Sequence, residues 1–283
     1  MGDVYRVIGN PVGHSKSPAI HAAFARAAGI DLTYDTCLAP LDGFAATVAT
    51  LGAAGCKGAN VTVPFKIDAF NLCTRLTARA SAAGAVNTLS FEGTDIIGDN
   101  TDGAGLVADI VGNAGVAIAG RRVLLVGAGG AARGAMLPLI EQGPASLILV
   151  NRTAASARAM AAQFKQFTQF NVAVDARTFA DLADEVAQNG PFDIVINATS
   201  ASLAGEVPPL PPGVFGPATL ALDMMYGAAP TPFMAFAAGC GAATRDGLGM
   251  LVEQAAEAFA VWRGVRPATA AVLASLRGDG PPL

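Results

Sequence analysis

Charged side chains of the types needed for proton transfer occur in two short stretches of this sequence, one largely apolar and one polar. Lys66 ends the run GANVTVPFK (residues 58–66), although the chain has only four lysines beside fourteen arginines. Asp102 lies in GDNTDG (residues 98–103), together with Asp99. A carboxylate can hold an ammonium group where it exchanges a proton, so a pair of Lys66 with one of these two aspartates would serve acid/base chemistry. DNTDG is equally typical of a simple polar turn.

A glycine-rich stretch, GAGGAA (residues 127–132), follows a run of leucine and valine and precedes an alanine-rich stretch. Between a strand and a helix, this G-x-G-x-x-A pattern is typical of a dinucleotide site. Gly127 would permit the tight turn, and Gly129 would let the backbone approach a pyrophosphate. The free N–H groups at the helix start would face the phosphates. The alternative is an ordinary tight turn between a strand and a helix.

The end of the next predicted strand indicates which dinucleotide would bind. An NAD site usually has Asp or Glu there, whereas this chain has Asn151-Arg152-Thr153. A carboxylate would repel a 2′-phosphate, but Arg152 would pair with it and Thr153 could donate a hydrogen bond. The pattern favours NADP(H) over NAD(H). The alternative is that Arg152 is a solvated surface residue.

The elements that would position these residues alternate between strand and helix. Before residue 102, three strand-like runs alternate with alanine-rich helical stretches at residues 17–28 and 41–53; the runs are VYRVIGN, GANVTVP and AVNTLSF. From residue 122 the order is βαβαβ, as in a dinucleotide-binding sheet, with strands at 122–126, 146–153, 171–174 and within 192–200, and helices at 154–164 and 181–187.

Residues 241–283 are predicted to be helical and to pack back on the first domain. We therefore expect two α/β domains separated by a cleft. Residues 1–101, completed by residues 241–283, would bind the substrate, and residues 102–240 would form a Rossmann-type NADP-binding domain.

Nine motifs, in order, resemble those of the shikimate dehydrogenases over roughly residues 5–267: GNPVGHSKSPAIH (9–21), GANVTVPFK (58–66), GAVNT (84–88), GDNTDG (98–103), GAGGAAR (127–133), NRT (151–153), INATS (196–200), DMMY (223–226) and DGLGMLVEQA (246–255). This resemblance implies NADPH-dependent, reversible reduction of 3-dehydroshikimate to shikimate in the pathway to aromatic amino acids.

The resemblance also implies roles for individual residues. Lys66 and Asp102 would be the catalytic pair. The substrate would be bound by Ser15, Ser17, Asn60, Thr62, Asn87, Tyr226 and Gln254. The cofactor would be lined by Gly127, Ala128, Gly129, Gly130, Ala131, Asn151, Arg152, Thr153, Thr199, Met224 and Gly247.

The residue types suit these roles, because shikimate carries one carboxylate and three hydroxyls that need short hydroxyl and amide partners. Asn60 and Thr62 would share one face of a strand, which a purely apolar core would not need. By composition alone, Ser17 before Pro18 is more typical of a helix N-cap. Gln254 could equally be a solvated helix residue.

In one place the sequence departs from the family. After INATS the family commonly has a glycine one residue on, whereas here Ala201 is followed by Ser202. We expect a modest effect on cofactor binding from this change. Two alternatives to the leading hypothesis remain: a quinate/shikimate dehydrogenase of mixed substrate and cofactor specificity, and a non-catalytic NADP(H)-sensing module. The module could dispense with Lys66 or Asp102, and both are present.

Composition excludes several other classes. The net charge of −4 and the absence of a basic stripe argue against nucleic acid as a partner. We expect no secretory signal and no membrane helix, because no apolar run approaches about 20 residues. The four cysteines and two histidines show no metal-ligand spacing, so no metal is expected, and reduced thiols suit a cytoplasmic protein. The chain would be a monomer or a homodimer.

Overall fold

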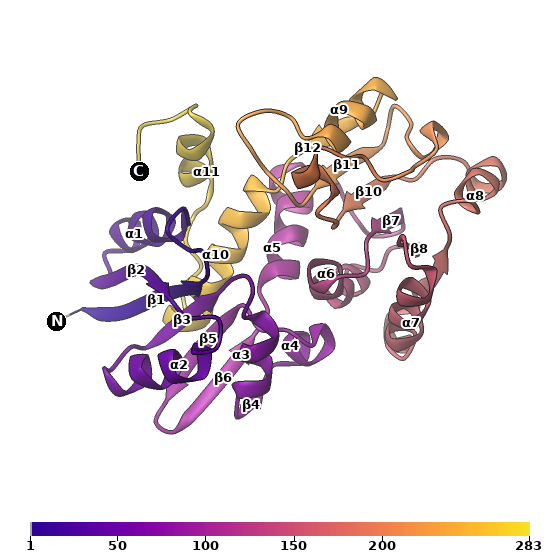
Figure 1. Cartoon of the computed structure of the whole chain (residues 1–283). Coiled ribbons are helices and arrows are strands. Elements are labelled where there is room, and N and C mark those ends of the chain that lie inside the picture. Colours follow the sequence, from indigo (N-terminus) through magenta and orange to yellow (C-terminus); the bar gives the residue numbers. More distant parts are fainter. Residues whose placement is uncertain (1) are drawn as a thin grey trace. The chain divides into compact units, whose positions relative to one another are not determined.

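The computed structural model describes residues 2–283, which form two α/β units (Figure 1). The first unit runs to Gly105 and resumes at Leu251–Leu283, and the second unit is Leu106–Met250. Each unit contains one six-stranded sheet. This confirms the predicted class of two α/β domains.

The sheet of the first unit is mixed and has the spatial order β2-β1-β3-β5-β6-β4. Its strands are β1 (Asp3–Gly9), β2 (Leu32–Leu38), β3 (Gly58–Val61), β4 (Arg75–Leu76), β5 (Thr88–Glu92) and β6 (Asp95–Asp99). β1 pairs in parallel with β2 and β3, whereas β5 is antiparallel to β3 and β6. Buried apolar side chains on one side of the sheet form a core that includes Ile8, Val61, Phe65 and Leu89.

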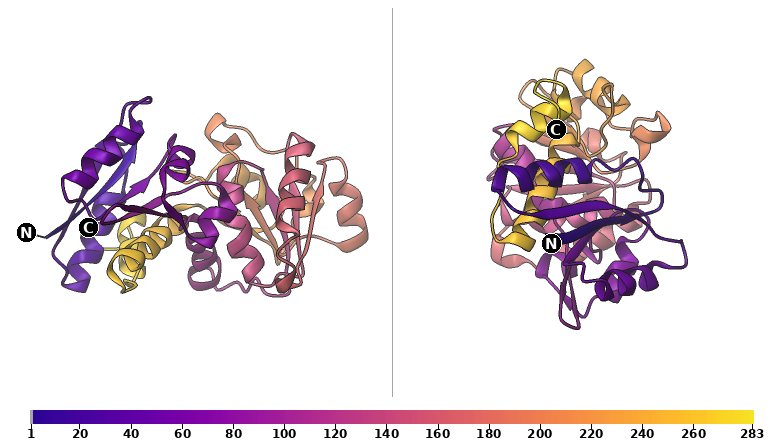
Figure 2. Two further views of the ribbon diagram at one scale, coloured as in Figure 1. Left: turned by 90° about the horizontal axis from the view of Figure 1, so that it is seen from below. Right: turned by 90° about the vertical axis from the view of Figure 1, so that its left-hand side faces the viewer.

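The helices of the first unit are α1 (Ser17–Ala28), α2 (Phe44–Ala53), α3 (Lys66–Leu72), α4 (Ala78–Ala83), most of α10 (Leu248–Arg263) and α11 (Ala270–Arg277). Figures 1 and 2 show α10, in yellow, beside the indigo and purple elements of this unit. The indole of Trp262 on α10 donates a hydrogen bond to the carbonyl of Leu89 (3.0 Å). Gly58 permits this approach, because a Cβ there would lie 2.6 Å from the indole nitrogen. Residues near the end of the chain thus complete the first unit.

The second unit is a parallel sheet in the order β12-β11-β10-β7-β8-β9. Its strands are β7 (Arg122–Val126), β8 (Ser146–Val150), β9 (Ala173–Arg177), β10 (Ile194–Asn197), β11 (Leu220–Asp223) and β12 (Ala243–Arg245). From the centre of the sheet, β7, β8 and β9 follow one another toward one edge, and β10, β11 and β12 follow one another toward the other edge. This is the strand order of dinucleotide-binding domains. The switch point lies between β7 and β10, where ligands bind beyond the carboxyl ends of the strands.

Helices and short turns connect these strands. They are α5 (Asp102–Ala108, which begins in the first unit), a π-helical turn (Asp109–Asn113), α6 (Gly130–Glu141), α7 (Ala154–Phe164), α8 (Leu182–Asn189), α9 (Pro232–Gly239) and 3₁₀ turns at Thr168–Phe170, Ala201–Ala204 and Pro212–Val214. β7, β8 and β10 are buried on both faces, as their apolar sequences predict.

The helical prediction for residues 241–283 is wrong at its start, because Ala243–Arg245 forms β12 and pairs in parallel with β11. Three residues are too few to show a periodic pattern, and this strand forms only because β11 offers a free edge. The second unit therefore continues to Met250, past the expected boundary at residue 240, and the first unit extends to Gly105, past residue 101.

Candidate active site

The structure brings Lys66 and Asp102 together in the first unit. Lys66 is the first residue of α3 and Asp102 is the first residue of α5, so each follows a strand of the same sheet. The ammonium Nζ of Lys66 donates a hydrogen bond to Oδ2 of Asp102 at 2.5 Å. The Lys66 side chain is 31% exposed and that of Asp102 is 14% exposed. The ammonium is therefore held in place yet accessible to a ligand.

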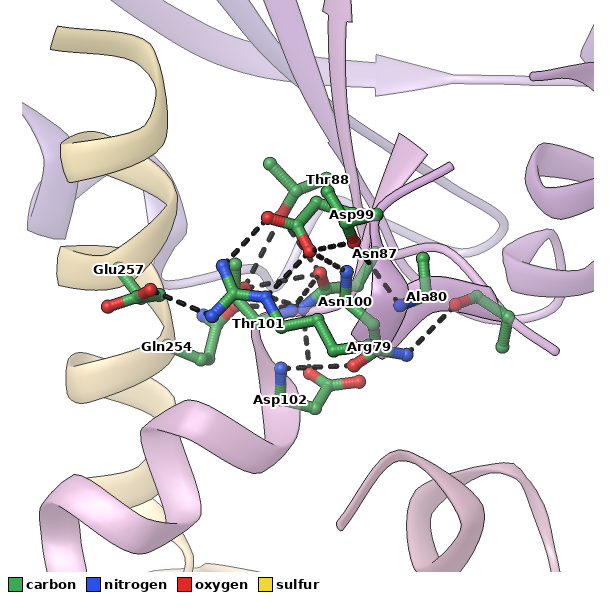
Figure 3. A network of polar contacts seen from close by, with 12 residues as sticks. Arg79, Ala80, Asn87, Thr88, Asp99, Asn100, Thr101, Asp102, Gln254 and Glu257 are labelled. Atoms are coloured by element: carbon green, nitrogen blue, oxygen red, sulfur yellow. Dashed lines mark hydrogen bonds and ion pairs between the residues drawn. The ribbon is translucent and has the colours of Figure 1, made fainter. Parts of the chain in front are cut away.

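The carboxamide of Asn87 contacts the other carboxylate oxygen of Asp102 (Figure 3). Its Nδ2 donates to Oδ1 of Asp102 (2.9 Å) and to Oε1 of Gln254 on α10 (3.3 Å). Its Oδ1 accepts a hydrogen bond from the backbone N–H of Thr101 (2.8 Å). Asn87, 2% exposed, thus connects the Lys66–Asp102 pair to α10. Gln254 is not merely a solvated helix residue, the alternative left open by the sequence.

Asn60 joins this network from β3. Its Nδ2 donates to Oγ1 of Thr88 and to the carbonyl of Asn87, both at 3.1 Å, and its Oδ1 accepts from the Tyr34 hydroxyl (2.7 Å). Thr62 lies just beyond β3 and is half-buried. Asn60 and Thr62 are therefore two polar side chains at the carboxyl end of the otherwise apolar strand β3.

Ser15 and Ser17 lie where the chain enters α1. Ser15 Oγ accepts a hydrogen bond from the backbone N–H of Ser17 (3.3 Å), and Ser17 is buried. The prediction that Ser17 is a helix N-cap is wrong. Lys16 occupies that position with helical backbone angles, so Ser17 lies inside the first turn, followed by Pro18.

His21, one turn further along α1, is buried at 1% exposure against Tyr34, with the two rings stacked at 4.2 Å. Burial lowers the pKa of His21 to about 3 and raises that of Tyr34 well above 10. Among residues 2–283, neither ring nitrogen of His21 has a hydrogen-bond partner. His21 is therefore neutral and forms an apolar wall behind Asn60.

The remaining residue predicted to bind substrate, Tyr226, belongs to the second unit. It is 40% exposed, and burial raises the pKa of its hydroxyl. Its hydroxyl is therefore protonated near neutral pH and can both donate and accept a hydrogen bond.

The glycine loop has the backbone that the sequence predicts. Gly127 follows β7 with φ at +115°, which favours glycine, and a Cβ there would approach the Ala198 carbonyl at 3.1 Å. Gly129 caps α6 and Gly130 begins it, and a Cβ on either would meet only open space. The N–H groups at the start of α6 therefore face an open region beyond the carboxyl end of β7, next to the switch point.

Asn151, Arg152 and Thr153 connect β8 to α7, where Thr153 is the N-cap residue. Asn151 Nδ2 donates to the Thr153 carbonyl (3.1 Å), which closes the turn. Arg152 is exposed and, within the described part of the chain, has no hydrogen-bond or ion-pair partner. Its charge is available to an anion.

Two further residues predicted to line the cofactor, Thr199 and Met224, lie just beyond the carboxyl ends of β10 and β11. Thr199 Oγ1 donates to Asn197 Oδ1 (2.7 Å), and the Met224 N–H donates to the Asn197 carbonyl (2.9 Å). Gly247 packs directly on this segment, because a Cβ there would lie 2.1 Å from the Met224 carbonyl oxygen. Thr199, Met224 and Gly247 thus lie close together within the second unit.

Comparisons with known proteins agree with this arrangement. Family models match residues 7–89 (shikimate dehydrogenase substrate binding domain), 108–204 (shikimate/quinate 5-dehydrogenase) and 247–277 (shikimate 5′-dehydrogenase C-terminal domain). The shikimate dehydrogenase (NADP(+)) of Herminiimonas arsenicoxydans is 61% identical over 279 residues, covering 99% of this chain and 98% of that protein. The chain belongs to the shikimate dehydrogenase family.

Solved structures extend this family relationship to the whole fold. The Ael1 enzyme from Pseudomonas putida is 46% identical with a TM-score of 0.89, and 99% of each chain is covered. Shikimate 5-dehydrogenase from Thermus thermophilus, solved in complex with NADP(H) and shikimate, is 28% identical with a TM-score of 0.84, over 98% of this chain and 99% of that chain. The two-domain α/β prediction therefore holds over nearly the full length.

The departure from the family pattern at Ser202 has a structural counterpart. Asp223, at the end of β11, is fully buried, and its carboxylate accepts hydrogen bonds from Ser202 Oγ (2.6 Å), Thr231 Oγ1 (2.6 Å), Asn197 Nδ2 (3.1 Å) and the Met225 N–H (3.1 Å). Ser202 thereby ties the loop after β10 to β11. The sequence pattern did not reveal Asp223, because Asn197 and Ser202 come from β10 and the turn after it, more than 20 positions away.

No metal site or membrane span emerges from the described part of the chain. In residues 2–283, no group of three or more His, Cys, Asp or Glu side chains is arranged to hold a metal ion. Over the same residues, every helix is too short or too polar to span a bilayer.

Proposed function

We propose that this protein catalyses the reversible, NADPH-dependent reduction of 3-dehydroshikimate to shikimate in the pathway to aromatic amino acids. The observation that carries the proposal is the Lys66–Asp102 pair at 2.5 Å, with Asn87 donating to the second oxygen of Asp102. The relative 61% identical to this chain is named shikimate dehydrogenase (NADP(+)). That name and the motif match favour shikimate as the substrate.

Lys66 would supply the proton that the reaction needs. NADPH, when bound, supplies the hydride that reduces a carbonyl carbon, which leaves negative charge on the carbonyl oxygen. The Lys66 ammonium has three N–H groups and uses one in its hydrogen bond to Asp102, so another can protonate that oxygen. Asp102 holds Nζ in place, and Asn87 fixes the plane of the Asp102 carboxylate by bonding Oδ1. In the reverse direction the Lys66 amine accepts the proton from the substrate hydroxyl.

The polar residues around this pair would bind and orient the substrate. Ser15 and Ser17 offer hydroxyl donors for the substrate carboxylate at the start of α1. Asn60, Thr62, Asn87 and Gln254 would bind ring hydroxyls, and Tyr226 would contribute a protonated hydroxyl from the second unit. This mixture of short donors and acceptors fits a small polyhydroxylated acid.

The second unit fits NADP(H) on two grounds. The loop at Gly127, Ala128, Gly129, Gly130 and Ala131 leaves open space in front of the α6 N-terminus, where a pyrophosphate would accept backbone hydrogen bonds. Arg152, unpaired within residues 2–283 and flanked by Asn151 and Thr153, would bind a 2′-phosphate. Thr199, Met224 and Gly247 would line the nicotinamide end.

The test is a spectrophotometric assay of NADP⁺ and NAD⁺ reduction with shikimate, run beside quinate. We expect fastest turnover with shikimate and NADP⁺. Comparable rates with quinate or NAD⁺ would favour a quinate/shikimate dehydrogenase of mixed specificity. No turnover with any pair, from protein that still binds NADPH, would contradict the catalytic proposal and favour the sensing module.

We place the reaction in the cytoplasm, in keeping with four cysteines that form no disulfide. The prediction of a monomer or homodimer stays open.

A further inference from the structure

Arg79 lies one residue inside the short helix α4, and its guanidinium bonds two carboxylates from different parts of the first unit (Figure 3). Nε and Nη2 donate to Oδ1 and Oδ2 of Asp99, both at 2.7 Å, in a bidentate pair. Nη1 donates to Oε1 of Glu257 on α10 (2.8 Å). A planar fork of N–H groups is suited to holding two carboxylates at a fixed separation, which a lysine cannot do.

Asp99, held by Arg79, also forms hydrogen bonds with Asn87 and with the residue that precedes Thr101 and Asp102. Its backbone carbonyl accepts the N–H of Asn87 (3.0 Å), and its Oδ1 accepts the N–H of Asn100 (2.7 Å). Asn100 Oδ1 in turn accepts the N–H of Asp102 (3.2 Å). The Asp99 carboxylate is thus linked through Asn100 to the backbone of Asp102, and the Asp99 backbone holds that of Asn87.

Glu257 connects Arg79 to α10. It lies three residues after Gln254, so the two side chains project from the same face of the helix. Gln254 bonds Asn87, whereas Glu257 bonds Arg79. Arg79 and Asn87 are thus two parallel connections between α10 and the segment that follows β6.

We propose that Arg79 is a positioning residue: its bidentate bond to Asp99 and its bond to Glu257 fix where Asn87, Asp102 and Gln254 meet the substrate. This rests on the proposed function, because the expected kinetic effect is on shikimate turnover. Arg79 itself need not touch the substrate.

The Arg79–Asp99 pair keeps its charges near neutral pH, so its bidentate bond is present throughout that range. Burial by itself would raise the pKa of Asp99, but the hydrogen bonds and charge of Arg79, with a bond from Thr77, hold it below its usual value. The same carboxylates raise the pKa of Arg79 against the opposing effect of burial. Both groups therefore remain ionised wherever the protein is folded near neutral pH.

Arg266 provides a matched control. It also bonds Glu257 and, in addition, Glu253 on α10, but it contacts neither Asp99 nor the residues that follow it. Comparing R79K with R266K keeps the charge and the substitution the same. Only R79K removes the bidentate bond to Asp99.

The experiment measures steady-state kinetics and amide hydrogen exchange for wild type, R79K and R266K, well below their unfolding temperatures. For R79K we expect kcat/KM for shikimate to fall about tenfold or more, because small misplacements of catalytic groups have large rate effects. The KM for NADP⁺ should not change, because the glycine loop lies in the other unit. Amides of Asn87, Asn100 and Thr101 should exchange faster in unliganded R79K and at the wild-type rate in R266K.

Wild-type values of kcat/KM in R79K would overturn the proposal while leaving the proposed function intact. An equal loss in R266K would also overturn it, since the effect would then reflect the ion-pair network as a whole. If wild type does not turn over shikimate, the proposed function fails, and the exchange data still decide whether Arg79 positions these residues: unchanged exchange in R79K would refute it.

Discussion

The buried His21 side chain should make the stability of the first unit depend on pH. The imidazole packs against both Tyr34 and Trp262, with ring-centroid distances of 4.2 Å and 5.5 Å, and Phe24 and Phe259 lie nearby. Burial among these rings lowers the pKa of His21 from 6.5 to about 3, against a smaller opposing effect of Asn60. Between these two values the unfolded chain binds a proton and the folded chain does not.

This difference fixes the sign and size of the effect. Because the unfolded state binds more protons, lowering the pH through 6.5 favours unfolding, and the loss continues until about pH 3. The full loss would be about 5 kcal/mol. At about pH 5.5, which stays above the isoelectric point of about 5.1, the His21 share is about 1.4 kcal/mol relative to about pH 7.5.

Urea unfolding followed by the fluorescence of Trp262, the one tryptophan of the chain, measures this directly, because Trp262 lies in the first unit and stacks on Tyr5 at 4.6 Å. The unfolding free energy of H21F should fall by about 1.4 kcal/mol less than that of wild type between about pH 7.5 and 5.5. The exposed His14 is the control, and H14F should behave as wild type. Identical pH dependences for wild type and H21F would refute the reasoning.

Three further predictions concern the catalytic lysine, the cofactor and the second unit. Lys66→Ala should lower kcat by at least about 10²-fold with little change in KM, the range of acid/base contributions; a large rise in KM at unchanged kcat, in steady-state assays, would mean that Lys66 only binds. Arg152→Ala should weaken NADPH binding far more than NADH binding, measured by fluorescence titration, and equal weakening would contradict pairing with the 2′-phosphate. Gly249→Ala should destabilise the second unit by about 2 kcal/mol or more in thermal unfolding, because a Cβ would lie 1.8 Å from Oδ1 of the fully buried Asp109. Gly52→Ala, in open space on α2, should be neutral or slightly stabilising, and an equal effect of both changes would show that packing at Gly249 is not responsible.

Local sequence patterns predicted the elements whose signals are local. The strand Arg122–Val126 and the helices Ser17–Ala28 and Ala154–Phe164 have the predicted bounds. The strand Ser146–Val150 begins as predicted but ends three residues before the expected residue 153. Their apolar runs and flanking turn residues stand next to one another in the chain. The glycine loop belongs to the same class, because a tight turn needs only the residues that form it.

Contacts between distant residues could not be predicted in this way. Arg79 and Glu257 are 178 positions apart, and no composition rule separates Arg79 from the other arginines. Asp109 is likewise an ordinary acidic residue in the sequence, yet it is fully buried against Arg245, 136 positions away. β12 formed where only a helix was expected, because β11 supplied its partner.

The amino-acid order therefore specifies which chemical groups the protein has and the succession of strands and helices that carries them: a lysine after an apolar run, an aspartate in a polar stretch, and a glycine loop after an apolar strand. Tertiary structure decided which of these groups meet. Lys66 and Asp102 are 36 positions apart, and they lie at 2.5 Å because the strands that precede them belong to one sheet. Hydrogen-bond partners are set by distance in space, which chain folding determines and residue spacing does not.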